Sequence, residues 1–128
     1  MAEHVEIDLP LSAKYASTVR TVAASIAAEI GLSIQDIDDL RLGVNEAISV
    51  LTDVDDDGLD FEVARLTVRF EAEGDRIGVA ASRSGVGSAD LQIDMLAEKI
   101  LGAVVDEFSI DDAGVVRLLK RRSSHDDT

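Results

Sequence analysis

The spacing of apolar residues changes along this 128-residue chain from the period of a helix to the period of a strand. From 14 to 51, apolar residues recur every three or four positions, which gives one apolar face to a helix. From 64 onward, several short runs alternate apolar and polar residues between turn residues, as half-buried strands do. Two amphipathic helices followed by strand pairs pack best as helices against a sheet, which indicates an α/β fold.

Caps and turns set the expected order of elements. A strand over 5–9 precedes a helix over 14–30, which Ser12 caps and Gly31 ends. Ser33 and Asp36 form a capping pair at the start of a second helix, over 34–51. We expect a hairpin of strands 64–71 and 76–82, a third helix over 91–104, and short strands over 105–110 and 115–119. This order predicts a two-layer α/β sandwich, with a mixed, mostly antiparallel sheet and helices on one face.

The apolar faces of the three helices should supply much of the core. With 3% aromatic residues, that core must be aliphatic. The residues predicted to face it are Tyr15, Val19, Val22, Ala23, Ile26 and Ile30 in the first helix, Ile34, Ile37, Leu40, Val44, Ala47, Ile48 and Leu51 in the second, and Met95, Leu96, Ile100, Ala103 and Val104 in the third. The length suggests one domain over 1–122, with a disordered polar tail over 123–128.

Composition excludes several classes of function. Without cysteine there is no disulfide framework, thiolate zinc site or cysteine nucleophile. The acidic start lacks the apolar stretch of a signal peptide, and no apolar run is long enough to span a membrane, so we expect a cytoplasmic protein. A net charge of −14 should repel nucleic acid and anionic membranes and attract a basic protein partner. An acidic surface can also serve solubility alone.

Three segments carry a resemblance to a known family. The segments 13–22, 36–47 and 105–108 resemble bacterial anti-sigma factors with serine-kinase activity, which belong to the GHKL superfamily of histidine-kinase-like ATPases. The resemblance implies the superfamily's Bergerat-type α/β sandwich, ATP and Mg²⁺ as cofactors, and a homodimer. The implied partners are a sigma factor and an anti-anti-sigma antagonist of the STAS type. It also implies that Arg20 lies on the partner-binding surface.

The family's nucleotide site consists of three sequence boxes, and the first departs from the family pattern here. Glu46 matches the family's general base. Four residues later, where the family has the Asn that binds Mg²⁺, this chain has Val50, which offers no oxygen ligand. Ser49 and Thr52 carry oxygens, but we expect each to point to a different side of the helix. If Glu46 has no catalytic role, it is a solvated helix residue or a partner of Arg41 or Asn45.

The second and third boxes depart as well. Gly85 and Gly87 match the glycines of the family's Asp-x-Gly-x-Gly motif, which contacts the nucleotide. The position of its Asp, which binds the adenine amino group, is Arg83, and Arg can only donate hydrogen bonds. The third box is glycine-rich in the family, whereas the segment 94–99 has no glycine and two carboxylates.

These departures favour an anti-sigma factor that sequesters a sigma factor and whose ATP site is degenerate. One alternative is an active ATP-dependent serine kinase that phosphorylates the antagonist. Another is a calcium-binding acidic module, because 53–58 matches the first half of a calcium loop. Its twelfth position is Ala64 instead of Glu, and Asp60 or Glu62 would have to substitute. His4 and His125 lie at opposite ends, so no catalytic triad or metal site is predicted.

Overall fold

A computed structural model describes residues 3–54, 59–86, 91 and 93–123. Gly87, His125 and positions 55–58 of the acidic stretch lie outside the described residues. The elements in chain order are β1 (Glu3–Pro10), a 3-10 turn η1 (Ala13–Tyr15), α1 (Ala16–Glu29), α2 (Ile34–Thr52), β2 (Arg65–Glu73), β3 (Arg76–Ser84), α3 (Met95–Val104), β4 (Glu107–Ile110) and β5 (Val116–Arg121).

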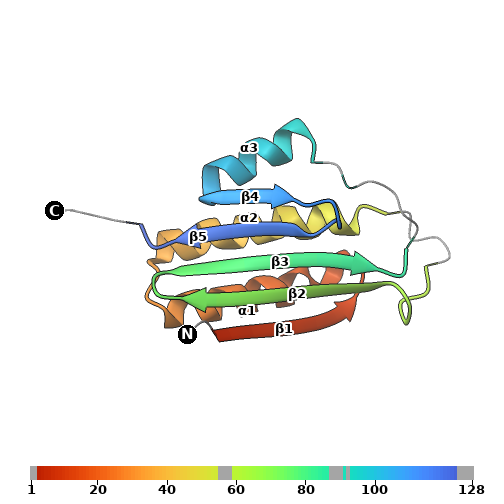
Figure 1. The fold of residues 1–128 in the computed structure, drawn as a ribbon, viewed down its shortest axis with the longest axis horizontal. Helices are drawn as coiled ribbons and strands as arrows, with labels where there is room; N and C mark the ends of the chain where they lie inside the picture. Colours follow the sequence, from red (N-terminus) through yellow and green to blue (C-terminus); the bar gives the residue numbers. More distant parts are fainter. Residues whose placement is uncertain (1–2, 55–58, 87–90, 92, 124–128) are drawn as a thin grey trace.

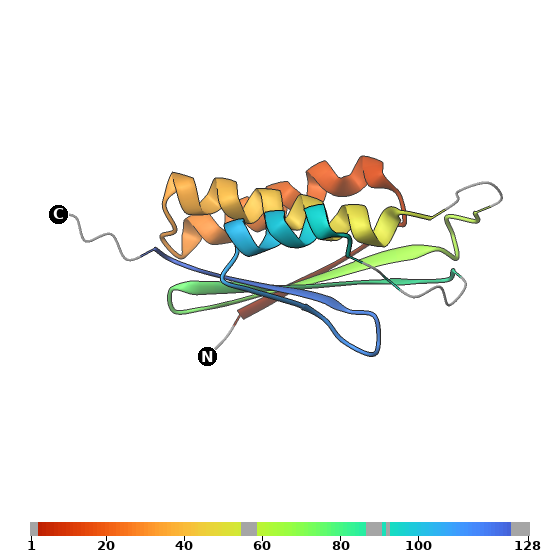
Figure 2. The ribbon, with the colours of Figure 1, turned by 90° about the horizontal axis from the view of Figure 1, so that it is seen from above.

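One five-stranded sheet, in the order β1-β2-β3-β5-β4, forms one layer, and the three helices cover one of its faces (Figures 1 and 2). The predicted two-layer sandwich is therefore confirmed. All four strand pairings are antiparallel, so the predicted mixed sheet is wrong in that detail. After α3 the chain first runs along the edge as β4. It then turns back as β5, which inserts between β4 and β3 and runs antiparallel to both.

The second helix begins where the sequence predicts, whereas the first begins two residues late, because Ser12 caps the 3-10 turn η1 and α1 follows it from Ala16 without a side-chain cap. The Ser12 hydroxyl accepts a hydrogen bond from the backbone N–H of Lys14 at 3.4 Å, and the Ser33 hydroxyl accepts one from the backbone N–H of Asp36 at 3.1 Å. Gly31 follows α1 with φ +84°, a conformation that costs glycine little. Gly31 and the Ser33 cap fix the turn between α1 and α2, which then pack side by side on the sheet.

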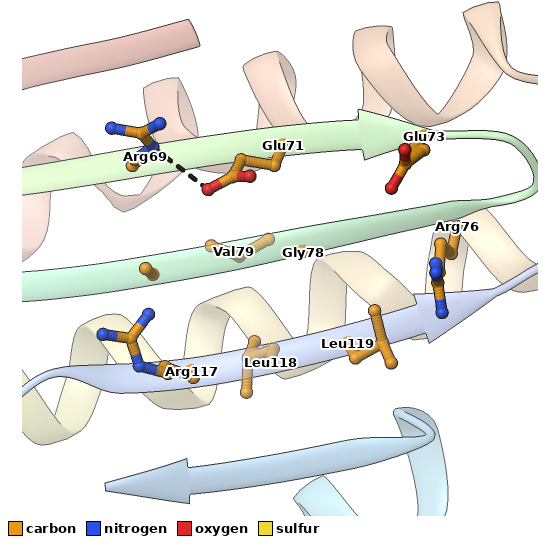
Figure 3. Close-up of a pocket in the computed structure, with 10 residues that line it drawn as sticks. Arg69, Glu71, Glu73, Arg76, Gly78, Val79, Arg117, Leu118 and Leu119 are labelled. Atoms are coloured by element: carbon orange, nitrogen blue, oxygen red, sulfur yellow. Dashed lines mark hydrogen bonds and ion pairs between the residues drawn. The ribbon is translucent and has the colours of Figure 1, made fainter. Parts of the chain in front are cut away.

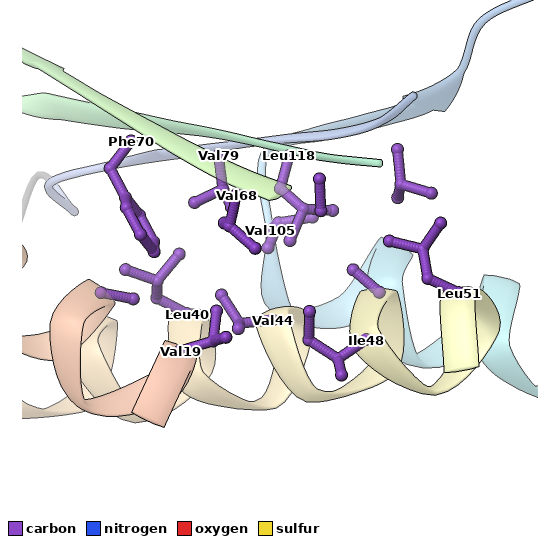
Figure 4. Packing of buried hydrophobic residues seen from close by; sticks show 14 of the residues in the cluster. Val19, Leu40, Val44, Ile48, Leu51, Val68, Phe70, Val79, Val105 and Leu118 are labelled. Atoms are coloured by element: carbon purple, nitrogen blue, oxygen red, sulfur yellow. The ribbon is translucent and has the colours of Figure 1, made fainter. Parts of the chain in front are cut away.

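The core lies between the helices and the sheet and is aliphatic, as predicted (Figure 4). Leu40, Val44, Ile48 and Leu51 form one stripe along α2 and face the inward side chains of the central strands. Phe70 of β2 is the one large aromatic ring among the buried residues that the structure describes. Each Å² of apolar surface that is buried contributes about 25 cal/mol to the stability of the fold, so this layer is its main source of stability.

The third helix differs from its prediction. It begins at Met95, not Leu91, because the Asp94 carboxylate caps it. Its buried residues are Ala97, Leu101 and Val104, whereas Met95 and Leu96 have exposed fractions of 73% and 67%, and Ala103 is also exposed. Apolar residues occupy several sides of this short helix, so periodicity alone did not identify the packed one. Ile34, at the first position of α2, is likewise exposed, although it was predicted to be buried.

The chain past β5 is held by hydrogen bonds as far as Ser123. Arg122 donates its backbone N–H to the carbonyl oxygen of Asp75 at 2.7 Å, and Ser123 donates its backbone N–H to the Asp36 carboxylate at 2.8 Å. Ser123, which the sequence assigns to a disordered tail, is thus tied to α2. Residues 124–128 lie outside the described part. Among the described helices, none is both long and apolar enough to cross a bilayer.

Candidate functional site

Two of the three predicted boxes meet at a hollow between α2 and α3. Its volume is about 410 Å³, and we call it the α2–α3 hollow. The described residues that line it are Glu46, Ser49, Val50, Thr52, Asp53, Asp94, Leu96, Ala97 and Ile100. The structure therefore brings the first box, on α2, next to the third, at the start of α3.

Glu46 and Val50 lie one turn apart on the side of α2 that lines this hollow. Glu46 is half-buried and has no hydrogen bond or ion pair within the described part of the chain, because Arg41 pairs with Asp38 and Asn45 with Arg20. Ser49 and Thr52 line the same hollow, contrary to the expectation that they point to different sides. The Thr52 hydroxyl donates to the carbonyl oxygen of Ile48 at 2.7 Å, as a helix residue often does.

The charge of the α2–α3 hollow is negative. Glu46, Asp53 and Asp94 contribute three carboxylates, and no described lining residue is Lys or Arg. The Asp94 carboxylate also accepts the backbone N–H of Ala97 at 2.8 Å. A helix N-terminus ordinarily attracts anions through such N–H groups. Here a side chain of the protein already satisfies one of them with its own negative charge.

The second box has structural roles of its own. Arg83 donates from Nη1 to the carbonyl oxygen of Leu51 at 3.0 Å, where its positive charge complements the C-terminal end of α2. Gly85 has φ +77°, and a Cβ placed on it would lie 1.9 Å from the carbonyl oxygen of Val63. The backbone conformation and the packing against Val63 thus both require glycine at 85, whether or not a nucleotide binds.

Arg20 lies at a second hollow, between α1 and α2, with a volume of about 400 Å³. The lining residues of this α1–α2 hollow are Arg20, Asp38, Arg41, Leu42 and Asn45. Arg20 is half-buried and donates from Nη1 to the side-chain oxygen of Asn45 at 2.6 Å. This bond joins the two helices and holds the guanidinium in place while its other N–H groups can still bind a carboxylate. The side chain of Leu42 beside it is 53% exposed.

A third hollow, of about 320 Å³, lies on the sheet face that the helices leave uncovered (Figure 3). Gly78 and Ala80 of β3 leave space between the longer side chains of β2 and β5. Arg69 pairs there with Glu71 at 3.2 Å. The surface carries both signs of charge, and none of the residues of the three boxes lines it.

A buried ionic cluster at the N-terminal end of α2 was not predicted from the sequence. Asp36, 1% exposed, accepts hydrogen bonds from the backbone N–H and the hydroxyl of Ser123. Lys120, also buried, lies 3.9 Å from Asp36 and 3.6 Å from Asp39, and donates to the carbonyl oxygen of Val104 at 3.0 Å. Burial acts to raise the pKa of Asp36, but the hydrogen bonds from Ser123, with Ser33 and Lys120, together hold that pKa below its ordinary value. The capping pattern predicted only that Asp36 lies at the start of a helix, and not that it contacts Ser123 and Lys120.

The acidic stretch has one described side chain with a local structural role. Asp60 accepts the backbone N–H of Glu62 at 2.9 Å, which stabilises the turn before β2. No group of three His, Asp or Glu side chains that could hold a metal ion occurs among the described residues. Positions 55–58 of the calcium-loop pattern are outside them, so calcium binding stays a prediction.

Comparison with known proteins adds the family relationship. No family model matches the chain. It is 27% identical to the serine-protein kinase RsbW of Bacillus licheniformis over 89% of this chain and 78% of that protein. It is 26% identical to that of Staphylococcus epidermidis, over 90% and 80% of the two chains. The chain is a homologue of the RsbW serine-protein kinases.

The length of the match differs between these relatives. The match to RsbW of Bacillus cereus strain B4264 has 27% identity and covers 66% of this chain. The chain thus spans about half the length of that kinase. The fold agrees with the crystal structure of the RsbU and RsbW domains of Rv1364c from Mycobacterium tuberculosis. The TM-score is 0.66 at 19% identity, over 96% of this chain and 33% of that one. The resemblance inferred from the three segments is thereby confirmed, together with the fold class.

Proposed function

We propose that this chain is an anti-sigma regulator of the RsbW type that acts by binding a sigma factor, and that its nucleotide site does not support kinase chemistry. The observation that carries this proposal is the α2–α3 hollow. It has an apolar Val50 at the position that matches the family's Mg²⁺ ligand, and its described lining carries three carboxylates and no Lys or Arg.

Mg-ATP does not fit the side chains of this hollow. Phosphoryl transfer depends on cations that neutralise the charge of the phosphates. The carboxylates of Glu46, Asp53 and Asp94 would instead repel the phosphates. The Arg83 guanidinium, bound to the end of α2, replaces the carboxylate that would accept the adenine amino group. Glu46, as a base, would therefore have no positioned phosphate to serve.

The α1–α2 hollow is the proposed sigma-binding surface. Arg20 is fixed by Asn45, and an ordered guanidinium beside the exposed Leu42 is typical of an interface anchor. The net charge of −14 would steer a basic partner toward the molecule and raise its association rate. A STAS-type antagonist that competes for the same surface would release the sigma factor. A homodimer, which the resemblance implies, and a cytoplasmic location, which the sequence predicts, are also parts of the proposal.

Surface-immobilised sigma factors of the source bacterium would test the binding function. We expect one of them to bind the purified chain equally well with and without Mg-ATP. Arg20→Glu should weaken that binding at least about tenfold, since a central Arg anchor contributes about 2 kcal/mol or more. Arg76→Glu, on the uncovered sheet face, is the matched control and should change it less than about twofold.

The opposite results would reject the proposal. If no sigma factor binds, or if Arg20→Glu and Arg76→Glu weaken binding equally, the α1–α2 hollow is not the partner surface. If phosphate from ATP is transferred to a serine of an antagonist domain, the chain is an active kinase.

A further inference from the structure

The α2–α3 hollow lies beside apolar side chains that the fold leaves unpacked. Leu96 lines the hollow and is 67% exposed, and its neighbour Met95 is 73% exposed. The wall is continued by Val50 of α2 and Ile100 of α3, both half-buried. Large apolar side chains gathered at a concave surface are typical of a protein-binding site.

The charges around these side chains restrict what can bind. Asp53 and Asp94 line the hollow with Glu46, and no described lining residue is basic. A phosphate-bearing ligand would be repelled. A bare metal ion lacks a site, because no described cluster of three acidic or histidine ligands has the right geometry. At this hollow, lined by three carboxylates, a second copy of a chain with net charge −14 would also be disfavoured, so the proposed homodimer would use another surface. A basic segment with a large apolar side chain satisfies both features.

We propose that the α2–α3 hollow is a docking site for a short, basic, amphipathic segment of a partner protein. An apolar side chain of the segment packs on Leu96, Val50 and Ile100, and its Lys or Arg side chains meet Asp53, Asp94 and Glu46. Asp94 can take part because its hydrogen bond to Ala97 uses only Oδ1 and leaves the second oxygen available. This surface is separate from the α1–α2 hollow, so it would add a second contact to the same partner or hold a different one.

A fluorescent synthetic peptide of Lys and Leu, with its Leu residues on one face of a helix, is the probe. Its binding to the whole chain would be followed by anisotropy, and the contact surface by amide chemical shifts. Leu96→Ser should weaken binding about tenfold, since one buried Leu side chain contributes that much. Ile34→Ser, a matched change at an apolar residue that is even more exposed, should leave the affinity within about twofold.

Charge is tested with a second pair of variants. Asp53→Asn should weaken binding about threefold, as expected of one exposed ion pair, while Glu29→Gln on α1 should not. Shift changes should fall mainly at residues 46–53 and 94–100. A control peptide with Ser in place of Leu should bind at least about tenfold more weakly. These substitutions are at exposed positions, and thermal melting would verify that each variant is folded.

Several outcomes would overturn this inference. Equal weakening by Asp53→Asn and Glu29→Gln, or equal binding of the Ser-containing peptide, would mean diffuse attraction to an acidic surface. Displacement of the peptide by Mg-ATP, with shifts at the same amides, would make the hollow a nucleotide site. A native dimer that Leu96→Ser dissociates in sedimentation would make a second copy the occupant. The sigma-binding result with Arg20→Glu is independent of all three.

Discussion

Asp36, at the start of α2, has a role that its sequence context only partly reveals. The pattern Ser33-x-x-Asp36 predicts a helix start, and Ser33 does cap α2. The same Asp36 also binds Ser123, 87 residues later, and faces Lys120. Local patterns predict local contacts, whereas this cluster depends on the register of β5, which no local pattern encodes.

The buried carboxylate predicts a pH-dependent stability. Because the pKa of Asp36 in the folded chain lies below its ordinary value of 3.8, the unfolded chain binds more protons near that pH. The stability that Asp36 contributes is thus present above pH 3.8 and lost as pH falls through the folded-state pKa. In urea unfolding at pH 7, Asp36→Ala should cost about 3 kcal/mol.

The control for this prediction is Asp38→Ala, an exposed residue whose pair with Arg41 is also exposed. This substitution should lower the free energy of unfolding by less than about 0.5 kcal/mol at any pH. The difference between the native chain and Asp36→Ala should shrink as the pH is lowered from 7 toward 3. A difference that stays constant over this range would contradict the account of Asp36.

Gly85 gives a second prediction at this scale. Alanine there would adopt an unfavourable positive φ and overlap the carbonyl oxygen of Val63, so Gly85→Ala should destabilise the chain by about 2 kcal/mol or more. Gly74→Ala, with φ +63° and no atom within 4 Å of the added Cβ, should cost about 1 kcal/mol. Denaturant midpoints compare the two. Equal costs would show that Gly85 does not pack as described.

At the scale of elements, the sequence predicts those whose signals agree. In α2 the cap and the apolar period agree, and the helix forms as expected; in α1 the period and the stop agree, but Ser12 caps a 3-10 turn and the α-helix begins at Ala16. In α3 they conflict, because its apolar residues extend around the helix and Asp94 interrupts the predicted span. The strands were located within a few residues, but their order and the insertion of β5 depend on packing between distant segments.

Two helical glycines provide a test of how closely α2 packs. A Cβ on Gly43 would lie 2.7 Å from Cγ1 of Val105, whereas one on Gly102 of α3 would meet nothing within 4 Å. Alanine favours a helix by about 1 kcal/mol over glycine. Gly102→Ala should therefore raise the unfolding free energy by about 1 kcal/mol, and Gly43→Ala should lower it by about 1–2 kcal/mol. If Gly43→Ala stabilises the chain as much as Gly102→Ala does, Val105 does not approach Gly43 as closely as described.

At the scale of the whole molecule, the fold and the family relation could be predicted from sequence, but the arrangement of the site only in part. The three segments identified the family, and the positions of Glu46 and Val50 followed from helical spacing. The contact of Arg83 with the end of α2 could not be predicted, because it joins residues 32 positions apart. Nor could the gathering of carboxylates and exposed Leu96 at one hollow, which needs α2 and α3 placed together.

The resemblance also predicts a homodimer, which light scattering combined with gel filtration would measure. The expected mass is twice the 13.6 kDa of the chain. A mass of 13.6 kDa at micromolar concentration would contradict this expectation without affecting the sigma-binding proposal.

Titration with Mg-ATP by calorimetry tests the central claim, that this fold has kept a partner surface but not a working nucleotide site. The native chain should show no binding at millimolar nucleotide. Val50→Asn restores the missing Mg²⁺ ligand alone, and it should not bind either, because Arg83 and the three carboxylates of the α2–α3 hollow remain. Tight binding of Mg-ATP by the native chain would contradict the claim, and Glu46 would then have to be tested as the base of an active kinase.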